Sequence, residues 1–265
     1  MKNLKVVIKG AGEMATGIAC RLYMANITRI LMLEIEHPVA IRRTVAFSES
    51  IYEREIEVEG TKAVLVEDLR ELDRLWGGQR IGVKVDPGWK AIQDLKPDVV
   101  IDAIMAKKNL GTKKEEAGLV VGVGPGFVAP HDVHMVVESN RGHNLGKVIY
   151  EGSAEPHTGI PGATMGFTVE RVLRAPHAGI VRHVRQIGDI IMKGDIVLYV
   201  DKTPVVSKID GLLRGLIREI HVEENEKVTD VDPRGIKEYC HSITDKARAI
   251  GGGVLEVVTQ YYIRG

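Results

Sequence analysis

The pattern of apolar positions changes at about residue 170. Before that point, runs of Val, Ile and Leu, such as residues 4–9, alternate with helix-like segments such as 18–25. Further apolar runs at 29–33, 81–85, 99–105 and 119–123 continue this alternation. Strands that alternate with helices form parallel sheets, because each helix carries the chain back across the sheet. We therefore predict an α/β fold with a Rossmann-like parallel sheet of at least five strands in residues 1–170.

From Arg171 onward the chain reads as many short strands, and it contains an imperfect repeat. Residues 179–182 (GIVR) match residues 211–214 (GLLR) at an offset of 32 residues. Such paired halves resemble the biotinyl and lipoyl carrier fold, so residues 171–239 are predicted to form a small all-β barrel-sandwich hybrid, and residues 240–265 to pack back on the first domain. The predicted core sets Val181, Val184, Ile190 and Ile196 against Leu213, Leu216, Val222 and Val228.

In a carrier domain the modified lysine lies at the hairpin between the two halves, where this chain has Lys202. No methionine brackets Lys202 as in biotin domains, and an exposed hairpin lysine is ordinarily only solvated. We therefore predict an unmodified docking module, and a biotinyl or lipoyl carrier is the least favoured alternative.

The first apolar run leads into a glycine-rich turn, GAGEMATG, of the form G-x-G-x-x-A. Glycines let the backbone approach a pyrophosphate, and the following helix points its N–H groups toward it. Gly10, Gly12 and Gly17 are therefore candidate cofactor-binding residues, with Glu34, at the end of the next run, as the partner of a ribose hydroxyl. Glu13 would repel a phosphate unless its side chain turns away. The alternative is a scaffold without this ligand.

Residues 122–162 are rich in glycine and polar side chains. Gly122, Gly124 and Gly126 would allow successive N–H groups to converge on an anion, or would simply form a tight loop around Pro125. Arg141 is a candidate partner for a phosphate or carboxylate.

Several side chains in this stretch have the chemistry of catalytic or metal-binding groups. In a strand, at most two of the side chains of His131, Asp132 and His134 would point to one face, and no third ligand is evident. We therefore predict no metal site. Asp132, His134 and His143 remain candidates for hydrogen-bonding or catalytic roles. No nucleophile and base stand in a recognisable order, so the sequence leaves open whether the protein is an enzyme.

A further glycine run precedes the last apolar segment, residues 254–262. Gly251 and Gly252, with Gly253, would form a second anion-binding loop at a helix start, with Lys246 and Arg248 as cations; a flexible hinge is the alternative.

Composition narrows the partners. Lys and Arg number 36, as do Asp and Glu, so no net field favours nucleic acid or an anionic membrane. The two cysteines are too few for a disulfide framework, and no signal peptide or membrane span is evident. We expect a cytoplasmic protein with small-molecule or protein partners, and homo-oligomer formation stays open.

Motifs along nearly the whole chain resemble one family. They include GAGEMATGIACRLY, AIRRTVAFSESIYE, KKNLGTKKEEAGLVVGVGPGF, DVHMVVESNRGHNLGKVIYEGSA and DKARAIGGGVLE. They resemble the accessory protein family of the selenium-dependent molybdenum hydroxylase system, the YqeB-like proteins. Glu13-Met14 departs from the family's usual aspartate and aliphatic residue, and His131 stands at a position that is commonly not histidine.

The resemblance implies a role in maturing molybdenum hydroxylases of the xanthine dehydrogenase type. The expected partner is such a hydroxylase or its cofactor-insertion machinery, and the expected ligand is NAD(P) or a molybdopterin dinucleotide. The alternative is an NAD(P)-dependent oxidoreductase, which would need a proton-transferring side chain such as His134 or His143 beside the nicotinamide.

Overall fold

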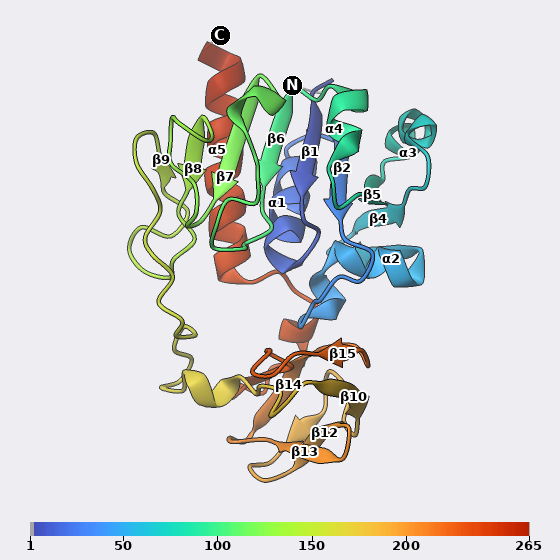
Figure 1. The fold of residues 1–265 in the computed structure, drawn as a ribbon, viewed down its shortest axis with the longest axis vertical. Coiled ribbons are helices and arrows are strands. Elements are labelled where there is room, and N and C mark those ends of the chain that lie inside the picture. The colour runs from blue at the N-terminus through green and yellow to red at the C-terminus, as the bar shows by residue number, and fades with distance from the viewer. Residues whose placement is uncertain (1–2, 265) are drawn as a thin grey trace. The chain divides into compact units, whose positions relative to one another are not determined.

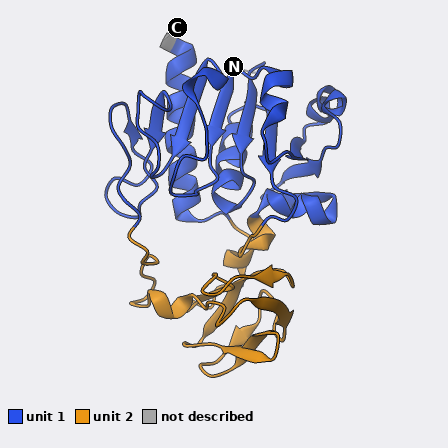
Figure 2. Ribbon diagram, in the orientation of Figure 1, with its two compact units in different colours: residues 1–38, 46–157, 243–265 blue, residues 39–45, 158–242 orange. Residues whose placement is uncertain are grey.

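The chain divides into two compact units in the structure, a computed structural model that describes residues 3–264. Unit 1 comprises Met1–Pro38, Ala46–His157 and Ile243–Gly265, and unit 2 comprises Val39–Val45 and Thr158–Ser242 (Figure 2). The chain therefore leaves unit 1 twice, first for a short segment and then for most of unit 2.

Unit 1 is built on a nine-stranded sheet of order β3-β4-β5-β2-β1-β6-β7-β8-β9 (Figure 1). The strands from β4 to β8 are parallel, whereas β3 and β9 pair antiparallel at the two edges. The central strand, β1, ends at Lys9, which pairs in register with Leu33 of β2 and Asp102 of β6. The strands are β1 Lys5–Lys9, β2 Arg29–Glu34, β3 Glu55–Val58, β4 Thr61–Leu65, β5 Ile81–Val85, β6 Val99–Asp102, β7 Leu119–Val123, β8 Met135–Val137 and β9 Val148–Ile149.

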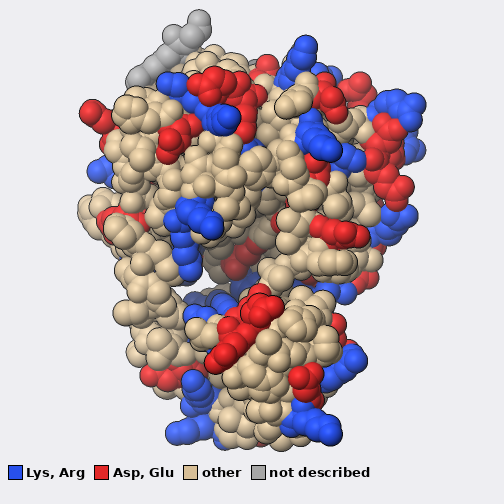
Figure 3. Space-filling model, in the orientation of Figure 1, with Lys and Arg blue, Asp and Glu red and all other residues tan. Residues whose placement is uncertain are grey.

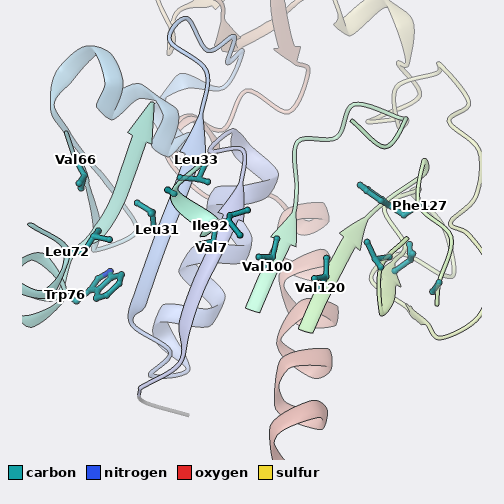
Figure 4. Packing of buried hydrophobic residues seen from close by; sticks show 14 of the residues in the cluster. Val7, Leu31, Leu33, Val66, Leu72, Trp76, Ile92, Val100, Val120 and Phe127 are labelled. Atoms are coloured by element: carbon teal, nitrogen blue, oxygen red, sulfur yellow. The ribbon is translucent and has the colours of Figure 1, made fainter. Parts of the chain in front are cut away.

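Helices cover both faces of this sheet. In Figure 1, α1 and α5 lie behind the sheet and α4 lies in front. The front core contains Val7, Leu31, Val100 and Val120 from four neighbouring strands, with Ile92 of α4 in the same cluster (Figure 4). The helices are α1 Glu13–Met24, α2 Ser50–Glu53, α3 Leu72–Gly77, α4 Lys90–Leu95 and α5 Asp245–Arg264; short 3-10 turns span Arg43–Val45, Phe47–Glu49, Leu69–Glu71, Lys114–Glu116, Val169–Arg171 and Lys237–Cys240.

Unit 2 contains two antiparallel sheets, of order β13-β12-β10-β15 and β11-β14-β16. Each sheet mixes the two halves of the sequence repeat, since β10 pairs with β15 and β11 pairs with β14. The strands are β10 Gly179–His183, β11 Ile190–Ile191, β12 Ile196–Val200, β13 Thr203–Val206, β14 Gly211–Leu216, β15 His221–Val222 and β16 Thr229–Asp232.

The predicted fold class, a Rossmann-like parallel sheet followed by a barrel-sandwich hybrid, is wrong. The sheet of unit 1 is mixed, because the turn at Glu59-Gly60 closes a β3–β4 hairpin at one edge and β9 turns back on β8 at the other. The β-rich part forms two separate antiparallel sheets. An alternation of strand-like and helix-like segments in the sequence indicates only those strands that are connected by helices. Hairpins at a sheet edge contain no helix, so this pattern does not predict them.

The predicted core of unit 2 is correct in one half of the repeat and partly wrong in the other. Val181, Leu213, Leu216, Val222 and Val228 are buried. In contrast, Val184 is 50% exposed and Ile190 is 55% exposed. Ile191, next to Ile190, and Val197, next to the half-buried Ile196, are fully buried instead. Because successive strand residues point to opposite faces, a one-residue error in alignment moves a side chain from the core to the surface.

Two further properties concern the helices and the surface charge. Within residues 3–264, no helix is long and apolar enough to cross a membrane. On the face shown in Figure 3, acidic and basic side chains are interspersed.

Candidate functional site

The carboxyl edge of the unit 1 sheet is the place where a ligand site is expected. From β1 the chain passes to β2 on one side, and it later returns to β6 on the other side. In open α/β sheets, ligands bind in the crevice that such a reversal of strand order leaves beyond the strand ends. The loops that follow β1, β2, β5, β6 and β7 all lie at this edge.

The glycines of the first loop serve different purposes. Gly10 has a φ of +89°, and a Cβ there would lie 3.2 Å from the Ile104 Cα, so close packing against the loop after β6 requires glycine. Gly12 is the N-cap of α1, and a Cβ there would meet no described atom within 4 Å. Gly17 lies inside α1, where its Cβ would lie 2.7 Å from the Ala247 Cβ. Gly12 alone of these three borders open space, whereas Gly17 is a helix-packing residue.

Glu34 ends β2, where the sequence placed the acidic residue. Its carboxylate accepts hydrogen bonds from the backbone N–H of Ala11 at 2.8 Å and of Ile35 at 2.9 Å. Burial raises the pKa of Glu34, and these two hydrogen bonds oppose the rise. The carboxylate thus holds the glycine loop in place.

Glu13 turns toward α5. It accepts a hydrogen bond of 2.9 Å from the Thr244 hydroxyl, and the same hydroxyl accepts the N–H of Ala247 at 3.3 Å. This side chain therefore belongs to the contact between the first turn of α1 and the residue that precedes α5, and its charge stays within electrostatic range of Lys246.

Cationic side chains gather at the same edge. Lys246, in the first turn of α5, is half-buried. Burial and then Arg141 lower the pKa of Lys246, while the carboxylates of Glu13, Glu138 and Asp245 raise it. Burial, Lys107 and Lys246 together lower the pKa of His157. Lys107 and Lys246 thus both lie within electrostatic range of His157.

A second cluster surrounds the end of β1, where Lys9 is fully buried. The Lys9 ammonium donates to the Thr112 hydroxyl at 2.7 Å, lies 2.7 Å from a Glu116 oxygen and faces the Trp89 ring at 3.6 Å. The Thr112 hydroxyl in turn donates to Asp102 at 2.6 Å. Burial lowers the pKa of Lys9, which Glu116 partly counteracts, and burial raises the pKa of Asp102.

The sequence interpretation missed this cluster. A detectable signal was present, because Lys9 is a charged residue in an otherwise apolar strand at the point where the strand enters the glycine loop. A buried lysine requires hydrogen-bonding and charged partners.

Gly122, Gly124 and Gly126, at the end of β7 and just after it, lie in tightly packed positions. A Cβ added to Gly122 would lie 2.5 Å from the Phe127 ring, and a Cβ added to Gly126 would lie 2.6 Å from the Lys108 backbone. The N–H of Gly124 donates to the Val137 carbonyl at 2.8 Å, and the Ser139 hydroxyl packs against Gly124. These glycines allow close packing, because their positions have a positive φ or leave no room for a Cβ. This arrangement is the tight loop that was the alternative to an anion-binding loop.

The three candidate catalytic residues are not brought together. His134 lies just before β8, where its Nδ1 accepts the N–H of Val120 at 3.0 Å, so it belongs to the amino edge of the sheet. Burial is the main cause that lowers the pKa of His134. Asp132 accepts the N–H of Val128 within a turn, and His143 is exposed in the loop after β8.

The remaining candidates have structural surroundings. Arg141 makes two hydrogen bonds to Asp245, at 2.6 and 2.9 Å. Gly251 and Gly252 lie inside α5, so the prediction that they form a loop before a helix is wrong. A Cβ on Gly251 would lie 3.0 Å from the Gly17 carbonyl oxygen, whereas Gly252 borders an apolar groove of about 530 Å³ on the outer side of α5.

Comparison with known proteins identifies a relative along nearly the whole chain. No protein-family model matches. The chain is 44% identical over 261 residues to a protein of Escherichia coli (strain K12) named "Uncharacterized protein YqeB", in a match covering 98% of this chain and 48% of that protein. This chain is therefore similar to YqeB along nearly its whole length. It spans about half the length of that curated relative.

The similar solved structures are distant. A product-bound ectoine utilization protein EutE (DoeB) from Ruegeria pomeroyi shares 11% identity at a TM-score of 0.24, covering 80% of this chain and 61% of that one. A succinylglutamate desuccinylase/aspartoacylase from Rhodobacter sphaeroides shares 14% identity at a TM-score of 0.26, covering 86% and 85%. At these scores the likeness carries no argument about this chain.

Proposed function

We propose that unit 1 of this YqeB-like chain binds an anionic, nucleotide-bearing ligand at the carboxyl edge of β1. The observation that carries the proposal is the open approach to Gly12 at the start of α1, with Lys246, Lys107 and His157 at the same edge. The first N–H groups of a helix have no partners within it, and the helix dipole favours negative charge there. A phosphate group is the ligand chemistry that suits such an edge.

The role that we propose for this binding is maturation of a selenium-dependent molybdenum hydroxylase of the xanthine dehydrogenase type. It rests on the motifs shared with the YqeB-like family, and the ligand would be a molybdopterin dinucleotide or NAD(P). The partner would be the hydroxylase or its cofactor-insertion machinery.

The alternative, an NAD(P)-dependent oxidoreductase, lacks comparable support. It needs a proton-transferring side chain near the reacting end of the ligand. His134 lies at the amino edge and accepts a backbone N–H, and His143 is exposed in the loop after β8. The carrier alternative depends on Lys202, an exposed residue in the β12–β13 turn.

Calorimetric titration with NAD, NADP and cytidine nucleotides tests the proposal. We expect saturable binding of at least one of them, and absence of binding by all would refute it. Gly12→Val should abolish binding in a folded protein, because the branched side chain fills the approach to the helix start. Gly77→Val is the matched control, since Gly77 also has open space around its Cβ position but lies in α3.

Lys246→Met supplies a second test. A hydrogen bond to a charged group contributes about 1.5–3 kcal/mol, so loss of the Lys246 ammonium should weaken binding roughly ten- to hundredfold. Unchanged affinity would exclude Lys246 from the site.

A further inference from the structure

Trp89 has an unusual backbone conformation. It lies in the loop between β5 and α4 with φ 56° and ψ 29°, the left-handed region that bulky residues rarely occupy. Asp86 stabilises this turn, because its carbonyl accepts the N–H of Trp89 at 3.1 Å and its carboxylate accepts the N–H of Ala91 at 2.7 Å. Strain of this kind persists where the surrounding structure imposes it, and it is concentrated at functional sites.

This conformation places the indole ring over a buried charge. The Lys9 ammonium lies 3.6 Å from the ring centroid, and Thr112 and Glu116 hold that ammonium in place. The ring also lies beside Gly111, whose Cβ position is 3.9 Å from the indole Cζ3. One face of the ring is therefore fixed against the end of β1.

Part of Trp89 remains accessible to solvent. The residue is half-buried and packs against the front core, and Lys9 is its sole aromatic or cationic ring partner within residues 3–264. β5 is the neighbour of β2, which is the neighbour of β1. The loop that carries Trp89 therefore lies at the same sheet edge as Gly12, two strands away along the edge.

We propose that the exposed surface of Trp89 is a stacking wall for a planar heteroaromatic ring, either a nucleobase or a pterin. An aromatic side chain stacks any such ring without reading its hydrogen-bonding edge. Lys9 is a positioning residue, because its ammonium contacts one face of the indole and fixes the orientation of the ring. The inference deepens the proposed function: Gly12 would receive the phosphates, and Trp89 would receive the ring of the same ligand.

Tryptophan fluorescence provides a direct test, because Trp76 and Trp89 are the two tryptophans of the chain. Trp76 is buried and its Nε1 donates to the Ile30 carbonyl at 3.0 Å, so it is remote from solvent. In a Trp76→Phe protein the emission comes from Trp89. Cytidine, cytidine diphosphate, NAD and 6-hydroxymethylpterin should quench it, whereas pyrophosphate should not. If Trp76→Phe does not fold, the difference between wild-type and Trp89→Phe emission supplies the same signal.

Calorimetry with Trp89→Leu completes the test. Loss of stacking should weaken ring-containing ligands roughly ten- to hundredfold and leave pyrophosphate affinity unchanged, while Trp89→Phe should retain most of the affinity. Equal affinities for ring ligands in wild type and Trp89→Leu, or no quenching by any ring compound at millimolar concentration, would overturn the stacking wall.

The comparison between compounds separates the two proposals. Quenching by cytidine or the pterin without any binding of pyrophosphate would support the wall and contradict the phosphate site. Preference for the pterin over cytidine, or the reverse, identifies which ring the wall accepts.

Discussion

The Glu34 carboxylate is half-buried, and its two hydrogen-bond donors are neutral amides, those of Ala11 and Ile35. Burial penalises the charged form more than these bonds favour it, so the pKa of Glu34 rises. The loop is thus held by a group whose ionisation costs stability. A glutamine at this position would keep an acceptor oxygen for Ala11 without carrying that charge.

This arrangement predicts a pH dependence. Because the folded pKa lies above the ordinary value of 4.5, the folded protein holds this proton more tightly than the unfolded chain. The contribution of Glu34 to stability is therefore fully present below pH 4.5 and is lost as pH rises through the folded pKa. The difference in unfolding free energy between wild type and Glu34→Gln, from urea titrations at several pH values, should fall over that window.

The exposed residue Glu67, whose side chain is 72% exposed, provides the control for this experiment. Glu67→Gln should leave the pH profile close to that of wild type. Parallel profiles for wild type and Glu34→Gln would show that the Glu34 carboxylate ionises without cost.

At the level of elements, α1 and α5 cross in close contact within unit 1. Gly17 of α1 faces Ala247 and Gly251 of α5, and Gly253 packs against the Gly146 carbonyl. Glycine in a helix interior costs up to about 1 kcal/mol relative to alanine, and here the close backbone approach outweighs that cost. The run GGG is therefore a packing surface of one helix rather than a flexible hinge.

Alanine substitutions at two adjacent glycines distinguish packing from flexibility. Gly251→Ala should destabilise unit 1 by about 1–3 kcal/mol, because its Cβ would press on the Gly17 carbonyl at 3.0 Å and the Arg21 Cβ at 3.1 Å. Gly252→Ala should be neutral or stabilise by up to about 1 kcal/mol, since no described atom lies within 4 Å of its Cβ position. Thermal and urea unfolding measure both. Equal effects would contradict the packing role.

A matched pair in unit 2 tests the strand faces. Ile191 is fully buried, and Ile190 is 55% exposed on the same two-residue strand, β11. Ile191→Ala should cost about 2–5 kcal/mol, whereas Ile190→Ala should change the unfolding free energy by less than about 0.5 kcal/mol. A larger loss of unfolding free energy in Ile190→Ala than in Ile191→Ala would show that Ile190 is the core residue, as the repeat alignment predicts.

These elements also show what sequence can predict. The Gly10–Gly12 turn and Glu34 at the end of β2 follow from local periodicity, which a single strand and helix already display. The β11 face, the helical glycines 251–253 and the antiparallel edges depend on partners far away in the chain, such as Leu212 opposite Ile190 and Gly17 opposite Gly251. Likewise, Lys9 and Trp89 meet through tertiary structure, and no spacing in the sequence indicates their contact.

At the scale of the whole molecule, the order of the chain makes unit 1 depend on its last helix. Residues 243–265 return to unit 1 after unit 2 is complete. The buried side of α5 includes Ala247, Ile250, Val254, Val257 and Val258, all fully inaccessible. A fragment of residues 1–170, the first domain predicted from sequence, lacks these side chains and leaves the facing surface of α1 uncovered.

The fragment 1–170 should therefore fail to fold cooperatively. Burying an Ile or Val side chain contributes about 1.5–3 kcal/mol, so the four such residues supply roughly 6–12 kcal/mol, as much as the whole stability of a typical domain. A protein in which a flexible glycine-serine linker replaces residues 159–241, and which therefore keeps α5, should regain a cooperative urea transition. The buried indole of Trp76 reports that transition in both proteins. A cooperative transition of fragment 1–170 at the midpoint of the α5-containing protein would show that the nine-stranded sheet is stable without its last helix.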